Sequence, residues 1–327
     1  MNVIRFVRNW ILPLAIATGI VVYLLFHFVP FLQPIGEWYA PYNDSVLPDF
    51  MFLVLFVTFC KVDFGRLLPV RWHLWIGAQQ MVFALVLVGV ILGLGVSGGA
   101  LVMLEAILVC VVSPTASAAP VVTAKLGGSL EEMTTYTFLS NFISALLIPL
   151  CFPLLPQANG GTVSMAFAPL FFRILWKVSV VLLLPMIFAY FVKHYARGLH
   201  RRIVGVKDLS YYMWGCSLVV VSGTTAMNIR EAWERTSAFF LVSIALVGLV
   251  LCVVQFATGR CVGHYFDKTN EAGQALGQKN TAFAIWVATA FLHPLSSVGP
   301  GCYILWQNII NSVEIWMLRR RGLERSS

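Results

Sequence analysis

The chain has 327 residues, of which 59% are hydrophobic and only 11% are charged. Soluble domains carry roughly 25% charged residues and need polar side chains to cover their outside, so this composition excludes an ordinary soluble fold. The net charge of +8 would suit a nucleic-acid partner, but the basic residues lie between apolar segments, which indicates membrane topology and no nucleic-acid partner.

Apolar segments follow one another along the whole chain. A transmembrane helix needs about 20 mostly apolar residues, and ten segments reach or approach this length. They are residues 11–29, 46–60, 73–95, 101–124, 132–154, 170–192, 208–228, 236–260, 270–292 and 297–318. The first follows basic residues as in a signal peptide, but it is long and lacks a small-residue cleavage pattern, which predicts a retained helix. We therefore predict an all-α membrane protein in which residues 1–327 form one unit of ten transmembrane helices.

The positions of Lys and Arg support ten spans. Basic residues accumulate in cytoplasmic loops, and with a cytoplasmic N-terminus 17 of the 22 basic residues fall on that side. They are Arg5, Arg8, Lys61, Arg66, Arg71, Lys125, Lys193, Arg197, Arg201, Arg202, Lys207, Arg260, Lys268, Arg319, Arg320, Arg321 and Arg325. Only Arg230 and Arg235 fall on the outer side. We therefore expect a multi-pass protein of the cell's inner (plasma) membrane with both termini in the cytoplasm.

Two of the ten segments carry helix breakers in their middle. The break in 101–124 is Ser113-Pro114, where proline removes a backbone donor, and the break in 270–292 is the polar run 278–281 after two glycines. Unpaired backbone is costly in hydrocarbon, so such breaks persist where they line a cavity or are buried in protein. A single break is often a packing kink, but these two occupy the fourth segment of each five-segment half. Matching breaks in inverted halves indicate a transporter site near the membrane midplane.

Short motifs mark both breaks and the last segment. They are Ser113-Pro114-Thr115-Ala116-Ser117, Gly277-Gln278-Lys279-Asn280, and Trp306-Gln307-Asn308-Ile309 with Ser312; Gln79 in the third segment joins them. With these motifs the chain resembles the bile acid:sodium symporter family over nearly its whole length. The resemblance implies two inverted five-helix repeats in which the discontinuous helices four and nine cross. It also implies a core domain from 73–154 and 236–318 and a panel domain from 11–60 and 170–228.

The resemblance further implies where a solute binds. Its substrate-facing positions are Thr115, Ser117, Asn280, Gln307 and Asn308, to which we add Thr281. Helices that restart after a break direct free N–H groups and a positive dipole end at the cavity. We therefore expect a small organic solute that is anionic or forms strong hydrogen bonds. The sequence identifies neither this solute nor the direction of transport.

The chain departs from the family at the positions that bind sodium. Ala118 replaces an Asn, Ala275 an acidic residue and Lys279 a Gln, while Asn141 aligns with a Thr. A hard cation requires oxygen ligands, which alanine lacks, and an ammonium group repels the ion. We therefore predict no metal site and a sodium-independent carrier in which Lys279, with Gln79 and Asn141, replaces bound sodium.

The role of Lys279 leaves three possibilities open. If it keeps its proton through the cycle, transport is uniport or exchange, and if it releases and rebinds a proton, transport is proton-coupled. It could instead pair with Glu271 or another carboxylate and stiffen the core. Two other intramembrane carboxylates, Glu105 and Glu314, are functional suspects, but near span ends they could also reach headgroups or pair locally.

Other functions are judged by the residues they would need. A sodium-coupled organic anion symporter and a cation/proton exchanger remain alternatives, although an exchanger needs a carboxylate at the crossing, where Ala275 stands. No GxxxxGK[ST] loop is present for ATP, and the seven cysteines lack CxxC spacing, so we expect no cofactor. The histidines lie mostly at span ends rather than beside a nucleophile, so we predict no enzyme. The expected partners are the solute and the lipid bilayer, bound by a monomer.

Overall fold

The fold is all-helical. The computed structural model describes residues 3–39, 42–156, 167–206 and 209–326, and these contain helices and one isolated β-bridge but no strand. The helices are α1 (Val3–Phe28), α2 (Gln33–Tyr39), α3 (Asn43–Cys60), α4 (Arg71–Gly93), α5 (Gly98–Val112), α6 (Ala119–Lys125), α7 (Leu130–Cys151), α8 (Phe167–Leu182), α9 (Leu184–Tyr195), α10 (Arg197–Gly205), α11 (Leu209–Arg235), α12 (Ala238–His264), α13 (Thr269–Gly277), α14 (Thr281–Phe291) and α15 (Val298–Ser326). Short 3-10 turns are η2 (Phe64–Arg66), η3 (Phe152–Leu154) and η4 (Pro294–Ser297).

Several helices have the length and composition of transmembrane segments. Four apolar stretches of the described chain are long enough to cross a membrane: Arg71–Gly93, Leu130–Leu154, Phe167–Tyr195 and Ala238–His264. Shorter apolar helices cover Pro13–Phe28, Val46–Cys60, Gly98–Val112 and Thr281–Phe291. The chain is therefore a helical membrane protein, as its composition predicts. The count of ten spans and their inverted repetition remain predictions.

The predicted sixth span consists of two helices. α8 ends at Leu182 and α9 begins at Leu184 with a proline in its first turn. Proline has no N–H to continue the hydrogen-bond ladder but fits the first turn of a new helix. The short helix α10 follows directly, where the sequence predicts only a basic loop. With 9 residues, α10 is too short to span a membrane.

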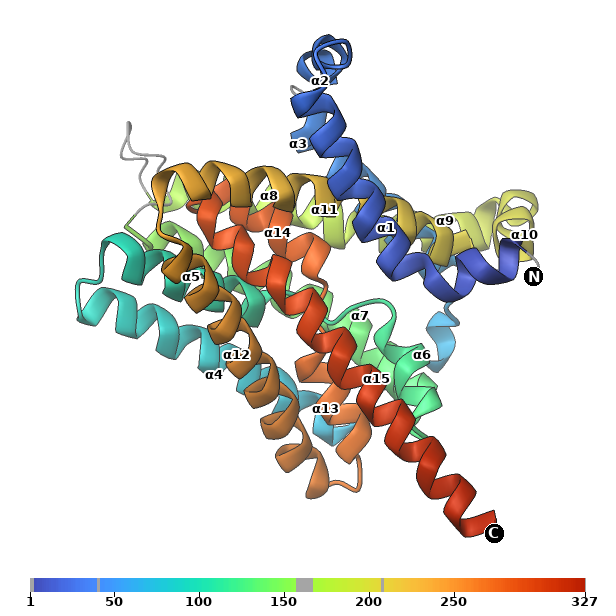
Figure 1. Ribbon diagram of the computed structural model, residues 1–327. Coiled ribbons are helices and arrows are strands. Elements are labelled where there is room, and N and C mark those ends of the chain that lie inside the picture. The colour runs from blue at the N-terminus through green and yellow to red at the C-terminus, as the bar shows by residue number, and fades with distance from the viewer. Residues whose placement is uncertain (1–2, 40–41, 157–166, 207–208, 327) are drawn as a thin grey trace.

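The helices pack as two neighbouring sets (Figure 1). In one set α11 packs against α1 and α3, and α3 against α8 and α9. In the other set α12 packs against α13 and α15, α4 packs against α5 and α7, and α6 packs against α7 and α13. α1 and α11 approach closely at Gly19, which has no side chain. A Cβ atom there would lie 2.2 Å from the carbonyl oxygen of Val219. The division into a core and a panel domain is compatible with this packing and stays a prediction.

Both predicted helix breaks are confirmed. α5 ends at Val112 and α6 begins at Ala119, while α13 ends at Gly277 and α14 begins at Thr281. Between these helices the two extended segments run antiparallel through the bridge between Thr115 and Lys279. The broken helices therefore cross at their interrupted centres, inside the second set of helices.

Candidate functional site

The crossing is held by backbone hydrogen bonds between its two segments. Ala116 N donates to Gln278 O at 2.9 Å, and Asn280 N donates to Pro114 O at 2.8 Å. Each segment thus satisfies backbone groups that the broken helices leave unpaired, which is required in a region without water. This pairing fixes Lys279 opposite the first break.

Lys279 places its ammonium group on the end of the other broken helix. The side chain is buried, with 1% of its surface exposed. Its Nζ donates to Val111 O at 3.0 Å and to Ser113 O at 3.2 Å. Carbonyl groups in the last turn of a helix lack intrahelical donors and carry partial negative charge. The lysine therefore supplies both a positive charge and two hydrogen bonds at the C-terminal end of α5.

A second side chain donates to the same carbonyl groups. Gln80 Nε2 lies 2.9 Å from Val111 O and 3.2 Å from Ser113 O. The sequence prediction chose Gln79, but the structure places Gln80 here, and Gln79 is only partly buried. Gln80 lies on the buried face of α4 with Ile76 and Gly77. The structure distinguishes the two glutamines, whereas the sequence does not, because α4 is apolar on its exposed face as well as its buried face.

The end of the other broken helix, α13, is also supplied with a donor. Tyr303 donates its hydroxyl hydrogen to Gly277 O at 2.7 Å, and Gln255 Nε2 donates to the Tyr303 hydroxyl oxygen at 3.0 Å. Both side chains are fully buried. The sequence analysis does not single out Tyr303 or Gln255, because their roles depend on which helices pass beside Gly277. The negative ends of both broken helices are thus occupied by side chains of this chain.

Three of the predicted substrate-facing residues have structural hydrogen bonds at the crossing. Thr115 donates its hydroxyl hydrogen to Ala275 O at 2.7 Å. Gln307 accepts from Lys279 N at 2.9 Å and donates to Lys279 O at 3.2 Å, so it brackets the lysine backbone. Asn280 accepts from Phe283 N at 3.2 Å and caps α14. These side chains shape the crossing, and a solute would have to use their remaining hydrogen-bonding capacity.

The other predicted positions vary in exposure. Ser117 and Asn308 are half-buried, whereas Thr281 is buried. Asn308 donates to Ile304 O at 2.6 Å in its own helix. Asn141 is buried in α7 and donates to Thr137 O at 2.9 Å rather than to the crossing. Ser117, half-buried beside the exposed Ala118, therefore offers the most accessible predicted hydroxyl of the first break.

The three possible carboxylate neighbours of Lys279 are engaged elsewhere. Glu271 accepts from Ser129 N at 2.9 Å, and none of the ion pairs between described residues includes Lys279. Glu105 is completely buried and accepts from Ser296 Oγ at 2.7 Å. Glu314 pairs with Arg260, which is the local pairing that the sequence allows for. The pairing of Lys279 with Glu271, which the sequence leaves open as an alternative, is not among the ion pairs of the described residues.

The crossing lacks a cluster of His, Cys, Asp and Glu residues among those that the structure describes. In the part of the chain that the structure describes, no group of three or more His, Cys, Asp or Glu residues is arranged to hold a metal ion. Ala118 and Ala275 contribute no side-chain oxygen at the crossing. The arrangement can therefore present a fixed cation and polar groups to a solute.

No protein-family model and no curated protein matches this chain. The fold and composition define a helical membrane protein with two broken helices that cross. The family resemblance and the activity that it implies accordingly remain proposals.

Proposed function

We propose that this chain is a secondary transporter of the bile acid:sodium symporter type, which moves a small organic anion or polar metabolite by alternating access. It would have ten spans in two inverted repeats and lie in the plasma membrane with both termini in the cytoplasm. The observation that carries the proposal is the buried ammonium group of Lys279 on the carbonyls of Val111 and Ser113. Polar groups and broken helices buried within a membrane protein are typical of transport sites.

We further propose that transport is sodium-independent. A sodium ion at such a crossing would neutralise helix-end carbonyl groups, and here Lys279 and Tyr303 donate to them instead. The cation is thereby covalently tethered, and its charge can balance an anionic solute without an ion from solution. Proton coupling through Lys279 remains the second version of this proposal, since a buried amine is able to exchange a proton.

Alternating access is supported by a difference in packing between α14, on one side of the crossing, and α6 and α13, on the other. α14 packs against α3 and α11 of the neighbouring set, and Asn228 of α11 donates to Ser297 Oγ at 2.8 Å. The main contacts of α6 and α13, the other two half-helices near this crossing, lie within their own set, with α4, α7 and α12. This asymmetry is what a carrier closed at one end of its site would have. In the change to the oppositely open conformation, the hydrogen bond between Asn228 and Ser297 would break.

Uptake into proteoliposomes tests the proposal. A thermal-shift screen of small organic anions on the purified protein would first select a solute. Its uptake would then be measured with sodium, potassium or choline outside, with and without a pH gradient. Equal uptake with the three cations is expected, and strict dependence on sodium would favour the sodium-coupled alternative. A response to the pH gradient would select the proton-coupled version.

A further inference from the structure

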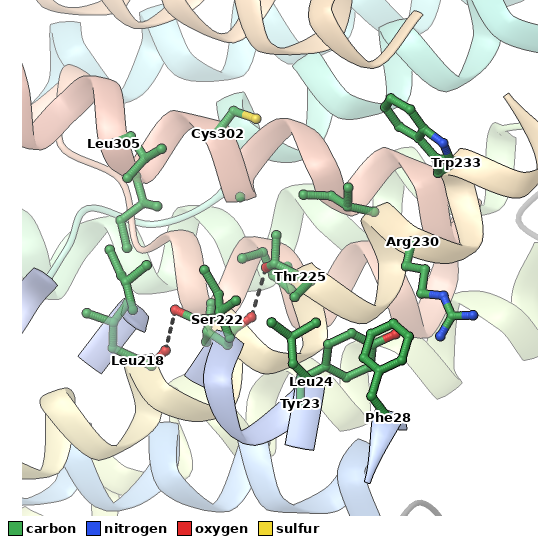
Figure 2. A pocket seen from close by; sticks show the side chains of 18 residues that line it. Tyr23, Leu24, Phe28, Leu218, Ser222, Thr225, Arg230, Trp233, Cys302 and Leu305 are labelled. Carbon is green, nitrogen blue, oxygen red and sulfur yellow. Dashed lines mark hydrogen bonds between the residues drawn. The ribbon is translucent and has the colours of Figure 1, made fainter. Parts of the chain in front are cut away.

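The short helix α10 lies at the end of α9, close to the N-terminus of the chain (Figure 1). It packs against α9 and α3. A cavity of about 500 Å³ lies between the two sets of helices, where α1, α11, α14 and α15 line it (Figure 2), and no residue of α10 belongs to its lining. α10 is therefore separate from the interior that the proposed transporter would open and close.

Two hydrogen bonds fasten α10 to the end of α3. His200 Nε2 donates to Cys60 O at 2.8 Å, because a carbonyl oxygen can only accept. Lys61 Nζ donates to the carbonyl oxygen of Val206, the residue after α10, at 3.4 Å. Ile203 of α10 also packs against the apolar core of the bundle. The position of α10 on the bundle is thereby fixed at several points.

The two sides of α10 differ in chemistry. Successive residues of a helix are about 100° apart, so Leu199 and Ile203 share one side, and Arg197 and Arg201 share the opposite side. Ile203 is half-buried, whereas both arginines are exposed. Arg202, between the two sides, is exposed as well. The three arginines form a basic surface directed away from the bundle, which we call the arginine surface.

The arginine surface has no carboxylate partner in the described part of the chain. None of the ion pairs between described residues includes Arg197, Arg201 or Arg202. Asp63, the acidic residue just beyond α3, already pairs with Lys193 at 3.2 Å. Like charges one helical turn apart repel each other, so Arg197 and Arg201 destabilise α10 unless an anion lies beside them. The surface therefore needs a negatively charged partner.

The surroundings of α10 indicate that this anion belongs to the bilayer. α10 follows directly on Phe167–Tyr195, a stretch long enough to cross a membrane. Tyr195 is 80% exposed, and tyrosine is enriched at the level of the lipid headgroups. Leu199 and Val206 expose about half of their apolar surface, 49% and 50%. Basic side chains next to exposed apolar ones, directly beyond a transmembrane helix, are typical of segments that bind anionic lipids.

We propose that the arginine surface binds the headgroups of anionic phospholipids. Guanidinium groups donate paired hydrogen bonds to phosphate oxygens, and Leu199 would lie among the neighbouring acyl chains. A zwitterionic lipid would bind less well, because its own cation already neutralises the phosphate. In the proposed topology these are lipids of the cytoplasmic leaflet. The binding does not depend on the solute or on transport at the crossing.

A comparison of two lipids tests the surface. The full-length protein in detergent would be titrated with phosphatidylglycerol, which is anionic, or with phosphatidylcholine of the same acyl chains, and native mass spectrometry would count the bound lipids. Wild type is expected to bind phosphatidylglycerol more tightly. The triple variant Arg197→Gln, Arg201→Gln and Arg202→Gln should bind it about tenfold or more weakly, since each basic group contributes roughly fivefold. Its affinity for phosphatidylcholine should not change.

Two matched triple variants control for charge and for place. The first changes each arginine of the arginine surface to lysine, which keeps the charge, and it should retain most of the preference for phosphatidylglycerol. The second removes three exposed basic side chains elsewhere and should bind as wild type; it combines Arg71→Gln, Lys125→Gln and Arg173→Gln. Thermal unfolding of each variant in the same detergent verifies that it is folded.

Several results would overturn the proposal. One is equal affinity of wild type for the two lipids, and another is an unchanged preference in the glutamine variant of the arginine surface. Equal losses in both glutamine variants would show a general effect of net charge without a site. Inorganic phosphate and a polyglutamate peptide would be titrated as well. If either bound to the arginine surface and phosphatidylglycerol did not, the partner would be a soluble anion or an acidic protein segment. None of these results bears on transport, so the proposed function is tested separately.

Discussion

Lys279 and Gln80 donate hydrogen bonds to the same two carbonyl groups, those of Val111 and Ser113. The amide comes from α4 and the ammonium group from the break between α13 and α14, so the end of α5 is held from both sides. Helix-end carbonyls in a low-dielectric interior need such donors. This arrangement fixes the position of the Lys279 amine at the end of α5.

Replacing Lys279 by methionine should abolish transport and leave the protein folded. The variant keeps the length of the side chain but removes the charge, while Gln80 still donates to both carbonyl groups. The free energy of unfolding should change little, because two effects oppose each other. Losing charged hydrogen bonds costs about 1.5–3 kcal/mol, but the penalty for burying an ammonium group is removed as well. Initial uptake rates and thermal unfolding would be measured on the same preparation.

Lys125→Met is the matched control for this variant. Lys125 is exposed at the end of α6, so its charge does not reach the crossing. The control is expected to transport as wild type. Wild-type rates in Lys279→Met would mean that the lysine has a structural role only.

Tyr303→Phe should destabilise the crossing from its other side. The change removes the donor to Gly277 O and leaves the Gln255 amide without its acceptor. An unsatisfied buried polar group costs about 1–3 kcal/mol, which should lower the temperature of thermal unfolding. Tyr265→Phe serves as the control, because 85% of Tyr265 is exposed. Equal unfolding temperatures for the two variants would contradict the role assigned to the Tyr303 hydroxyl.

Gln80→Leu and Gln79→Leu should differ clearly in stability. Gln80→Leu removes one of the two side-chain donors that Val111 O and Ser113 O have among the described residues, and should cost about 1–3 kcal/mol. Gln79 is half-buried, and its Oε1 has no hydrogen-bond partner among the described residues, so Gln79→Leu should change stability by less than about 0.5 kcal/mol. Thermal unfolding of both variants in one detergent measures the difference. A larger loss for Gln79→Leu would favour the original sequence prediction.

The sequence is sufficient to predict the helix breaks, because they depend on local chemistry. Pro114 has no N–H, and Gly277 must lack a side chain, since a Cβ atom there would lie 2.3 Å from the ring of Phe256. The choice between Gln79 and Gln80 is harder. α4 is apolar on its lipid-facing side as well as its buried side, so no polar face shows which way each glutamine points.

The contacts of Lys279 could not be predicted from spacing. Its partner carbonyls belong to a segment far away in the sequence, and backbone oxygens carry no residue-specific signal. The sequence places Lys279 in the second helix break, and the structure shows it at the crossing. Its role in place of a sodium ion stays a prediction, which depends on the resemblance to a family that has an amide at this position. The sequence does not single out Tyr303, whose role depends on which helix passes beside Gly277.

Introducing the sodium ligands that the family resemblance implies should create a sodium response that we expect the natural chain to lack. The variant combines Ala118→Asn, Ala275→Glu and Lys279→Gln, which introduces three oxygen-bearing side chains and removes the ammonium group. A ligand that binds only the folded state stabilises it by about 2.7 kcal/mol at roughly 100 times its Kd. The triple variant should therefore unfold at a higher temperature in sodium chloride than in potassium chloride, whereas wild type should unfold equally in both.

Two further variants separate the contributions in this experiment. Lys279→Gln alone removes the cation and supplies one amide oxygen, without the Asn and Glu ligands, and should show no selective response to sodium. Replacing the glutamate of the triple variant by glutamine, as Ala275→Gln, keeps the bulk at a position that is only 1% exposed but removes the carboxylate charge that a hard cation favours. The unfolding temperature of this variant should rise only slightly in sodium chloride relative to potassium chloride. If wild type itself were stabilised by sodium over potassium, Lys279 would not be replacing the ion, and the chain would be a sodium-coupled symporter.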